Sequence, residues 1–444
     1  MSSMAPTRTR VKTSHLYFSI ILAICPLVFI GAPFAFLKGI VTGNTRWYVL
    51  AMLIVYLFFK RNLIRYLDKR FTSIIFLYTL WCFFTTAWSS VITLSFVRSI
   101  ILMIVIIPMI SAGIEWVRTR SLDNCLNYLW LLAFSCLITC YLGMHNTEAF
   151  VIANNNRVMI YKGLMGQANM LGSMLMMSSP YLLWKTYRAW PHLLKRIVWG
   201  SLFFSCLFFI ILTISRSAIL AELAIIFIFF ASFSLNKKIF LILFGIVCLI
   251  GFFTTVDNST LVDLSNKYIY KNSVRQDLLA TRLGNWQRTF EGFQEAGWFG
   301  AGYGAAVDES FDLSTRLSQD QSGGKEKSNS ILAVMEEIGL VGLILYLLIF
   351  SVIFHKFFHL YAIAPTSQLR VLVGILFGTF VGMFIHSMFE SWWTAAGSPE
   401  SAYFWILIGV MRGVEIVFKQ HKMQLKTEAI ASFNANQLAQ EVRA

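Results

Sequence analysis

Charged residues are scarce in this sequence: they make up 13% of the 444 positions, whereas 57% are hydrophobic. Soluble domains are about one-quarter charged, so this supply cannot cover several water-exposed surfaces. Proline and glycine are also few, at 8 and 27 residues, which excludes long linkers and collagen-like repeats. These deficits exclude a water-soluble enzyme and a disordered chain. They favour a membrane protein whose residues mostly face lipid or other helices.

The seven cysteines form no CxxC pair and no His–Cys cluster with metal-ligand spacing. They lie mainly within or beside apolar runs, so we interpret them as small buried hydrophobic residues. The pattern argues against a secreted disulfide scaffold, and it offers no metal centre.

Long apolar runs predict an all-α polytopic membrane protein with about twelve transmembrane helices. The runs fall at 16–37, 47–59, 71–90, 94–114, 126–143, 166–184, 197–214, 217–235, 239–255, 330–354, 371–389 and 402–418. The basic N-terminus resembles a signal peptide, but Pro26 and Pro33 interrupt the first run, so we expect a retained span. The chain then divides into a cytoplasmic tail (1–15), nine helices (16–255), a large periplasmic loop (256–329), three helices (330–418) and a second cytoplasmic tail (419–444).

The net charge of +15 is explained by topology rather than by nucleic-acid binding. If both termini are cytoplasmic, the cytoplasmic segments contain 22 Lys and Arg. The short segments on the other side contain five, namely Lys38, Arg46, Arg157, Lys162 and Arg216. This asymmetry follows the positive-inside rule. We therefore expect no nucleic-acid partner and a multi-pass protein surrounded by membrane lipid.

The predicted loop 256–329 is long enough to be functional or disordered. Helical spacing of apolar residues over 274–296 favours packed structure. Within it, Arg282 and Trp286 lie at i,i+4 on one helical face, followed by Arg288 and a glycine-rich run from Gly297 to Gly304. Guanidinium groups bind phosphate bidentately, and we expect the tryptophan to stack on sugar rings.

Arg216 lies between two apolar runs, in the stretch Ser215-Arg216-Ser217. A charge there is costly unless it is paired or reaches water. One interpretation is an interfacial arginine that snorkels to water. The other is an anion site, in which the two serines supply hydroxyl groups and the helix start supplies free N–H groups.

Two further segments carry acidic groups at membrane depth. Glu336 and Glu337 lie about two turns into the helix that opens near Ser328-Asn329. Such acids are functional hypotheses by default, and the alternative is structural pairing with a buried arginine such as Arg98. His386 and Glu390 lie at i,i+4 just before Trp392, so they form either a general base pair or an interfacial group within an aromatic belt.

Gln167 and Asn169 open another helix, where their amides either bind hydroxyl groups or cap the helix. All these polar clusters fall on the predicted periplasmic side. Their placement predicts an arginine-rich cavity at the depth of the lipid headgroups. An anionic lipid-linked substrate fits such a cavity.

These motifs, in this order, resemble the O-antigen ligase and polymerase superfamily of bacterial envelope glycosyltransferases. The features are Trp88-Ser89-Ser90, Gly166-Gln167-Ala168-Asn169, Ser215-Arg216-Ser217-Ala218, Arg282…Trp286…Gly300-Ala-Gly302, and Asn329…Leu332…Glu337…Gly339. They extend over about residues 70–415.

The resemblance implies an enzyme of the inner membrane that uses neither a cofactor nor a metal. Its donor would be a glycan on undecaprenyl diphosphate, and its acceptor a glycan or lipid A–core hydroxyl at the periplasmic face. Arg216 and Arg282 would hold the diphosphate. Other polysaccharide assembly proteins stay open as partners.

Ser328 departs from the family pattern, because ligases usually carry histidine before the asparagine. His386 or Glu390 would replace that base, or Glu336 or Glu337 would serve, or arginine electrostatics would suffice. The departure favours a surface-polysaccharide polymerase over an O-antigen ligase. The alternatives are a flippase or transporter of the same lipid-linked glycan, and a catalytically inactive relative.

Overall fold

The computed structural model describes residues 45–153, 158–233, 280–306 and 327–441. The chain is mostly helical, with a single two-stranded sheet in the described ranges. The helices are α2 (Thr45–Phe59), α3 (Lys69–Phe84), α4 (Ile92–Arg118), α5 (Trp130–Gly143), α6 (Ala168–Arg188), α7 (Leu193–Leu212), α8 (Arg216–Ala231), α11 (Ala280–Ala296), α13 (Ser330–Ala362), α14 (Ser367–Ser387) and α15 (Pro399–Glu441). The 3₁₀ turns are η2 (Thr85–Trp88), η3 (Leu122–Asn124), η4 (Asn127–Leu129), η5 (Thr147–Ala149) and η7 (Gly297–Phe299).

Seven helices in the described residues are long and apolar enough to cross a membrane. They are the segments Lys69–Trp88, Ile92–Arg118, Leu122–Gly143, Leu193–Leu212, Ser330–Ala362, Ser367–Ser387 and Pro399–Gln424. The multi-pass helical class is thus confirmed, whereas the count of twelve stays a prediction. The spans expected at 16–37 and 239–255 lie outside the described residues.

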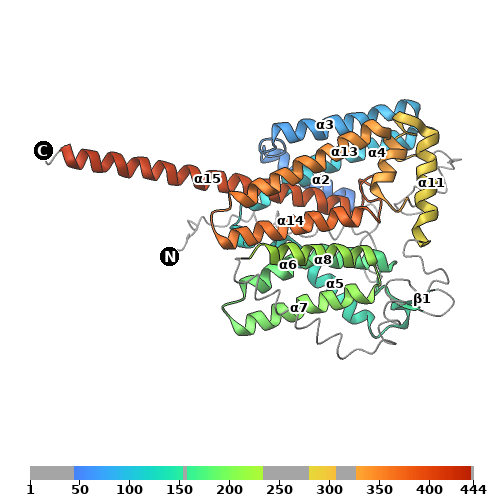
Figure 1. The fold of residues 1–444 in the computed structure, drawn as a ribbon, viewed down its shortest axis with the longest axis horizontal. Coiled ribbons are helices and arrows are strands. Elements are labelled where there is room, and N and C mark those ends of the chain that lie inside the picture. Colours follow the sequence, from blue (N-terminus) through green and yellow to red (C-terminus); the bar gives the residue numbers. More distant parts are fainter. Residues whose placement is uncertain (1–44, 154–157, 234–279, 307–326, 442–444) are drawn as a thin grey trace.

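Most helices run side by side in one bundle, and α11 runs across its end (Figure 1). The helix predicted within 274–296 is therefore present, over Ala280–Ala296. The strands β1 (Phe150–Ala153) and β2 (Val158–Tyr161) form an antiparallel hairpin at the same end, with Phe150 opposite Tyr161.

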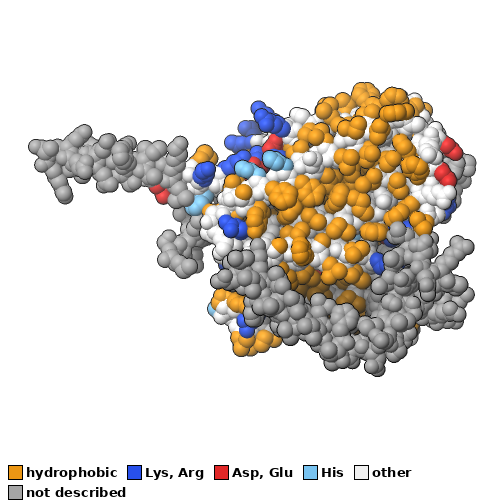
Figure 2. Space-filling view, viewed as in Figure 1, with side chains coloured by type: hydrophobic (Ala, Val, Ile, Leu, Met, Phe, Trp, Pro, Cys, Tyr) orange, Lys and Arg blue, Asp and Glu red, His pale blue; other side chains and the backbone are white. Residues whose placement is uncertain are grey.

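The two ends of the bundle differ in charge. Lys and Arg gather at the end from which α15 projects, and hydrophobic side chains cover the middle (Figure 2). There Lys356 donates to Asp68 over 2.6 Å, and Asp68 also caps the start of α3. Burial alone would raise the pKa of Asp68, but its hydrogen bonds to Lys356 and Phe71 and the charges of Lys356 and Arg412 lower it. This end corresponds to the segments that the sequence predicts to be cytoplasmic, and the orientation itself stays a prediction.

Glycines set the closest helix contacts. A Cβ on Gly409 of α15 would overlap the Ile110 carbonyl of α4, and Gly113 of α4 faces the Ile406 carbonyl in the same way. Along α14, Gly378 and Gly382 approach the backbone of α8, where an added Cβ would lie 3.1 Å from the Ile225 oxygen and 2.9 Å from the Ala221 oxygen. Small residues allow such approach in membrane helices. The α8–α14 contact also brings the start of α8 beside the end of α14.

We expect Gly409→Leu to destabilise the bundle by about 1–3 kcal/mol, because the new side chain must displace the α4 backbone. Gly200→Ala is the matched control, since its Cβ would meet only Thr186 Cγ2, at 4.0 Å. The check is the thermal unfolding midpoint of the detergent-solubilised protein. Equal losses in the two variants would contradict the tight α4–α15 contact.

Candidate functional site

The candidate site lies at the end of the bundle opposite the Lys- and Arg-rich end. The starts of α6, α8, α13 and α15 meet the end of α14 there, and α11 crosses over them (Figure 1). The elements therefore bring together residues that are more than 200 positions apart in the chain.

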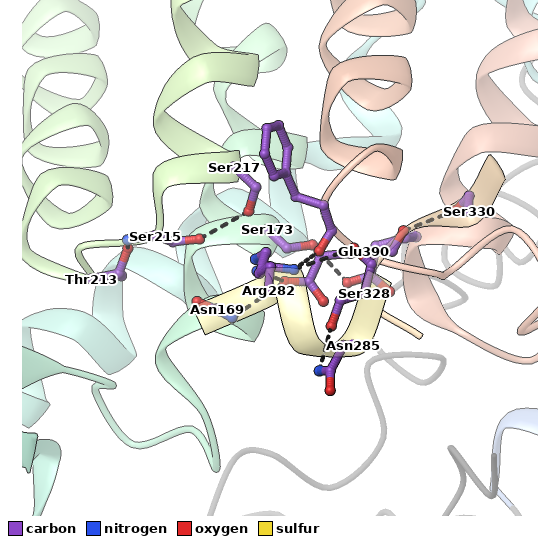
Figure 3. A network of polar contacts seen from close by, with 12 residues as sticks. Asn169, Ser173, Thr213, Ser215, Ser217, Arg282, Asn285, Ser328, Ser330 and Glu390 are labelled. Atoms are coloured by element: carbon purple, nitrogen blue, oxygen red, sulfur yellow. Dashed lines mark hydrogen bonds and ion pairs between the residues drawn. The ribbon is translucent and has the colours of Figure 1, made fainter. Parts of the chain in front are cut away.

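Arg282 of α11 is held by three oxygen acceptors. It donates to the Phe389 carbonyl, to Glu390 Oε1 at 2.9 Å and to the Ser328 carbonyl at 3.5 Å. Its side chain is 18% exposed, so the guanidinium is mostly buried but reaches the surface. Figure 3 shows Arg282 among Glu390, Ser328 and Asn169.

Ser328 contributes to this site mainly through its backbone carbonyl. Its φ of 53° is left-handed, which is uncommon for a residue other than glycine. Its carbonyl accepts from Trp286 Nε1 at 3.1 Å as well as from Arg282, and its hydroxyl accepts from Asn285 at 3.3 Å. The prediction that Arg282 and Trp286 share a helical face is confirmed by this common acceptor.

Glu390 links the segment after α14 to α6. Its Oε1 accepts from Arg282 and, at 3.3 Å, from Asn169 Nδ2. Its backbone carbonyl accepts from the Ser330 hydroxyl at 2.9 Å, which ties it to the start of α13. Glu390 is thus a fixed anion beside Arg282.

Arg216 is the first residue of α8 and follows a tight turn. Ile214 has a φ of 50°, and Ser215 N donates to the Thr213 hydroxyl. Ser215 and Ser217 are buried, with their hydroxyl oxygens 3.3 Å apart. Gly172 of α6 permits the turn, because a Cβ there would lie 2.9 Å from Ser215 Cβ.

Burial lowers the pKa of Arg216, and the positive charge of Arg282 lowers it further. Two neighbouring cations at a helix start form an arrangement that favours a multivalent anion. The sequence prediction that Arg216 and Arg282 together hold one diphosphate stays a prediction.

His386 is in the last turn of α14 and is 1% exposed. The charges of Glu400 and Arg282 both act on its ring. Glu400, near the start of α15, accepts from the Ser173 hydroxyl of α6 at 2.7 Å. His386 thus belongs to the site, on its buried side.

Glu336 and Glu337 form a separate ionic cluster. Lys327 Nζ lies 3.0 Å from each carboxylate and donates to the Ala305 carbonyl, also at 3.0 Å. Glu337 also accepts from the Gly304 N–H at 2.7 Å. Lys327 is therefore the cation beside both carboxylates. Arg98, the arginine that the sequence suggested for this pairing, instead donates to the Gly304 carbonyl at 2.6 Å.

The glycine-rich run docks into a kink of α13. Gly339 breaks the helix with a φ of 69°, and Ala301 N and Gly302 N donate to the freed carbonyls of Glu336 and Glu337. These glycines fix the connection after α11 to α13. The contacts of Glu337 are those of a structural anchor, and its catalytic role stays a prediction.

The remaining predicted residues lie around the Arg282 site with different contacts. Asn329 caps α13 by accepting from Ile331 N and Leu332 N. Exposed Gln167 is at the N-cap position of α6, where its side chain makes no capping hydrogen bond within the described chain. Arg288 is exposed and donates to Asn285, and Trp392 is 4% exposed against Trp393 and Phe404. Burial makes Trp392 less suited to sugar stacking than half-buried Trp286.

The sequence analysis missed Asn285, Ser173, the Phe389 carbonyl and Glu400. Glu400 had a usable signal, since it follows Pro399 at the opening of an apolar run, where helix starts favour acids. The Phe389 carbonyl had none, because no side-chain pattern marks a backbone acceptor.

Residues 201–347 match the family described as O-antigen ligase. This match supports membership of the O-antigen ligase and polymerase superfamily. The resemblance expected from the sequence is confirmed, and with it an O-antigen ligase-like role in glycan processing at a membrane. The match contains Arg216, Arg282 and Ser328 but ends before His386, Glu390 and Glu400. No curated protein matches the chain.

We expect Lys327→Met to destabilise the protein by about 3–5 kcal/mol, because it removes the cation that lies between two buried carboxylates. Exposed Lys195 is the matched control, as Lys195→Met. Thermal unfolding of the purified protein measures both. A Lys327→Met protein that melts with the parent would refute the structural assignment of this cluster.

Proposed function

We propose that the protein is a metal-independent glycosyltransferase of bacterial surface polysaccharide assembly. It transfers glycan from undecaprenyl diphosphate to a sugar hydroxyl at the periplasmic face of the inner membrane. The observation that carries the proposal is the pair of neighbouring guanidinium groups of Arg216 and Arg282 at one end of the bundle. A pyrophosphoryl lipid offers the multivalent anion that such a pair favours.

The bond changes assign a role to this pair. The acceptor oxygen attacks the anomeric carbon of the donor, and the bond from that carbon to the diphosphate oxygen breaks. The diphosphate leaves with the bonding electrons, and the acceptor proton passes to a base. Cations aimed at the leaving group stabilise the charge that develops there.

Glu390 shapes how the donor binds. The Glu390 carboxylate forms an ion pair with Arg282 at 2.9 Å, so a bound diphosphate must share that contact or replace it. Asn169 also donates to Glu390, so the carboxylate keeps this hydrogen bond when a diphosphate replaces its contact with Arg282. Half-buried Trp286 lies beside Arg282, where its ring can stack on the first sugar of the donor.

Polymerization is our first choice of reaction and ligation the second. Serine at position 328 contributes its carbonyl to Arg282 and lacks the imidazole that ligases usually carry there. The surface glycan of a deletion strain separates the two reactions on a gel. A single repeat unit on lipid core indicates a lost polymerase, whereas a bare core with polymer still made indicates a lost ligase.

We expect Arg282→Ala and Arg216→Ala each to lower glycan transfer by about 10²–10³-fold, as removal of one charge-stabilising donor does elsewhere. Arg70→Ala is the control, because Arg70 is exposed at the opposite end of the bundle. The measurement is complementation of the deletion strain at matched protein levels.

Full complementation by both site variants would end the proposal. Reconstitution with purified lipid-linked oligosaccharide separates the rival functions, because only an enzyme makes transferred glycan and free lipid diphosphate. Movement of the intact donor across the vesicle membrane would instead indicate a flippase, and neither product would indicate an inactive relative.

A further inference from the structure

His386 is a buried polar group without a hydrogen-bonding partner. Neither ring nitrogen has a partner among the described residues, although the side chain is 1% exposed. Buried polar side chains are normally satisfied, so an exception calls for an explanation. Each ring nitrogen can therefore exchange a hydrogen bond or a proton with a substrate hydroxyl.

The position of His386 relates it to the arginine site. Its backbone carbonyl accepts from Phe389 N at 3.0 Å and from Glu390 N at 3.1 Å. The same two residues hold Arg282 through the Phe389 carbonyl and the Glu390 carboxylate. The backbone of His386 is therefore bonded to the two residues that hold Arg282.

Glu400 supplies the opposite charge from α15. Its carboxylate acts favourably on a protonated His386, and the Ser173 hydroxyl holds its Oε1 at 2.7 Å. Ser398 caps the same helix start by accepting from Ser401 N at 3.1 Å. Glu400 is thus held in place from α6 and by its own helix end.

The other charged groups packed around α14 already have partners. Glu222 of α8 accepts from Ser179 through Oε2 at 2.6 Å, although its Oε1 has no partner among the described residues. The glutamates of α13 bind Lys327. Glu390 is paired with Arg282, while Arg216 lies at the start of α8 beside Arg282. The charges that act on the ring are those of Glu400 and Arg282.

We propose that His386 is the general base that accepts the proton of the attacking sugar hydroxyl, and that Glu400 supplies the compensating negative charge. The inference rests on the proposed glycan transfer. In the step, the acceptor O–H bond breaks, its proton binds a ring nitrogen, and the oxygen forms the new bond to the anomeric carbon. Glu400 stabilises the imidazolium that results.

Donor binding couples to this base through Arg282. The cationic guanidinium disfavours an imidazolium nearby, and a bound diphosphate cancels that charge. This arrangement lets histidine on α14 supply the function that position 328 lacks.

The test uses the full chain reconstituted with purified lipid-linked oligosaccharide and acceptor. We expect His386→Gln to lower kcat by about 10²–10⁴-fold, as loss of a general base does, while the donor KM stays near that of the parent. The matched control is His355→Gln, because His355 is exposed at the far end of α13.

The pH–rate profile separates a base from a packing residue. The parent should lose kcat at low pH as the imidazole becomes protonated, and His386→Gln should lose that acid limb. Glu400→Gln should lower the plateau and move the acid limb to lower pH, because the imidazolium loses its stabilising carboxylate. Glu400→Asp should restore part of the kcat plateau and part of the position of the acid limb. Glu295→Gln, at an exposed position, should change neither quantity.

Binding of a fluorescent lipid-linked donor is measured on the same preparations. Donor binding retained by His386→Gln, with kcat lost, supports the base. Parent-like kcat in His386→Gln, a persisting acid limb, or joint loss of donor binding overturns the assignment but leaves the glycosyltransferase proposal standing. Absence of transfer by the parent overturns both.

Discussion

Two like charges at one end of the helix bundle are the constraint on which this structure depends. The positive charges of Arg216 and Arg282 repel each other, and burial also disfavours the charged form of Arg216. Each guanidinium therefore needs nearby acceptors that stabilise its charge. Backbone carbonyls of Ser328 and Phe389 and one carboxylate, Glu390, provide that compensation for Arg282. Because two of the three acceptors are uncharged, the pair keeps an attraction for an incoming anion.

This compensation explains several unusual backbone features. Ser328 adopts a left-handed conformation that aims its carbonyl at both Arg282 and Trp286. Ile214 is left-handed in the turn that directs the chain into Arg216. Non-glycine residues in this region cost free energy and persist where surrounding contacts enforce them. The strain therefore gathers at the two turns that present the arginines.

The sequence predicted the helical class, the helix within 274–296 and the shared face of Arg282 and Trp286, because periodicity and hydropathy report local geometry. It also grouped the polar clusters at one end by charge counting alone. It missed Glu400 and the Phe389 carbonyl, since their roles come from helices that meet only in the fold. The Gly297–Gly304 run was open to several interpretations because no spacing rule shows what a glycine turn docks against.

Two kinds of acidic group lie in this region, and only one of them contacts the Gly297–Gly304 run. Glu336 and Glu337 neutralise Lys327 and hold the glycine turn, so their removal tests folding. Glu390 is paired with Arg282, and the charge of Glu400 acts on His386, which gains a proton in the proposed step. Loss of activity therefore means different things in the two pairs. Only carboxylates whose partner changes charge during the reaction can alter its pH dependence without altering the stability of the bundle.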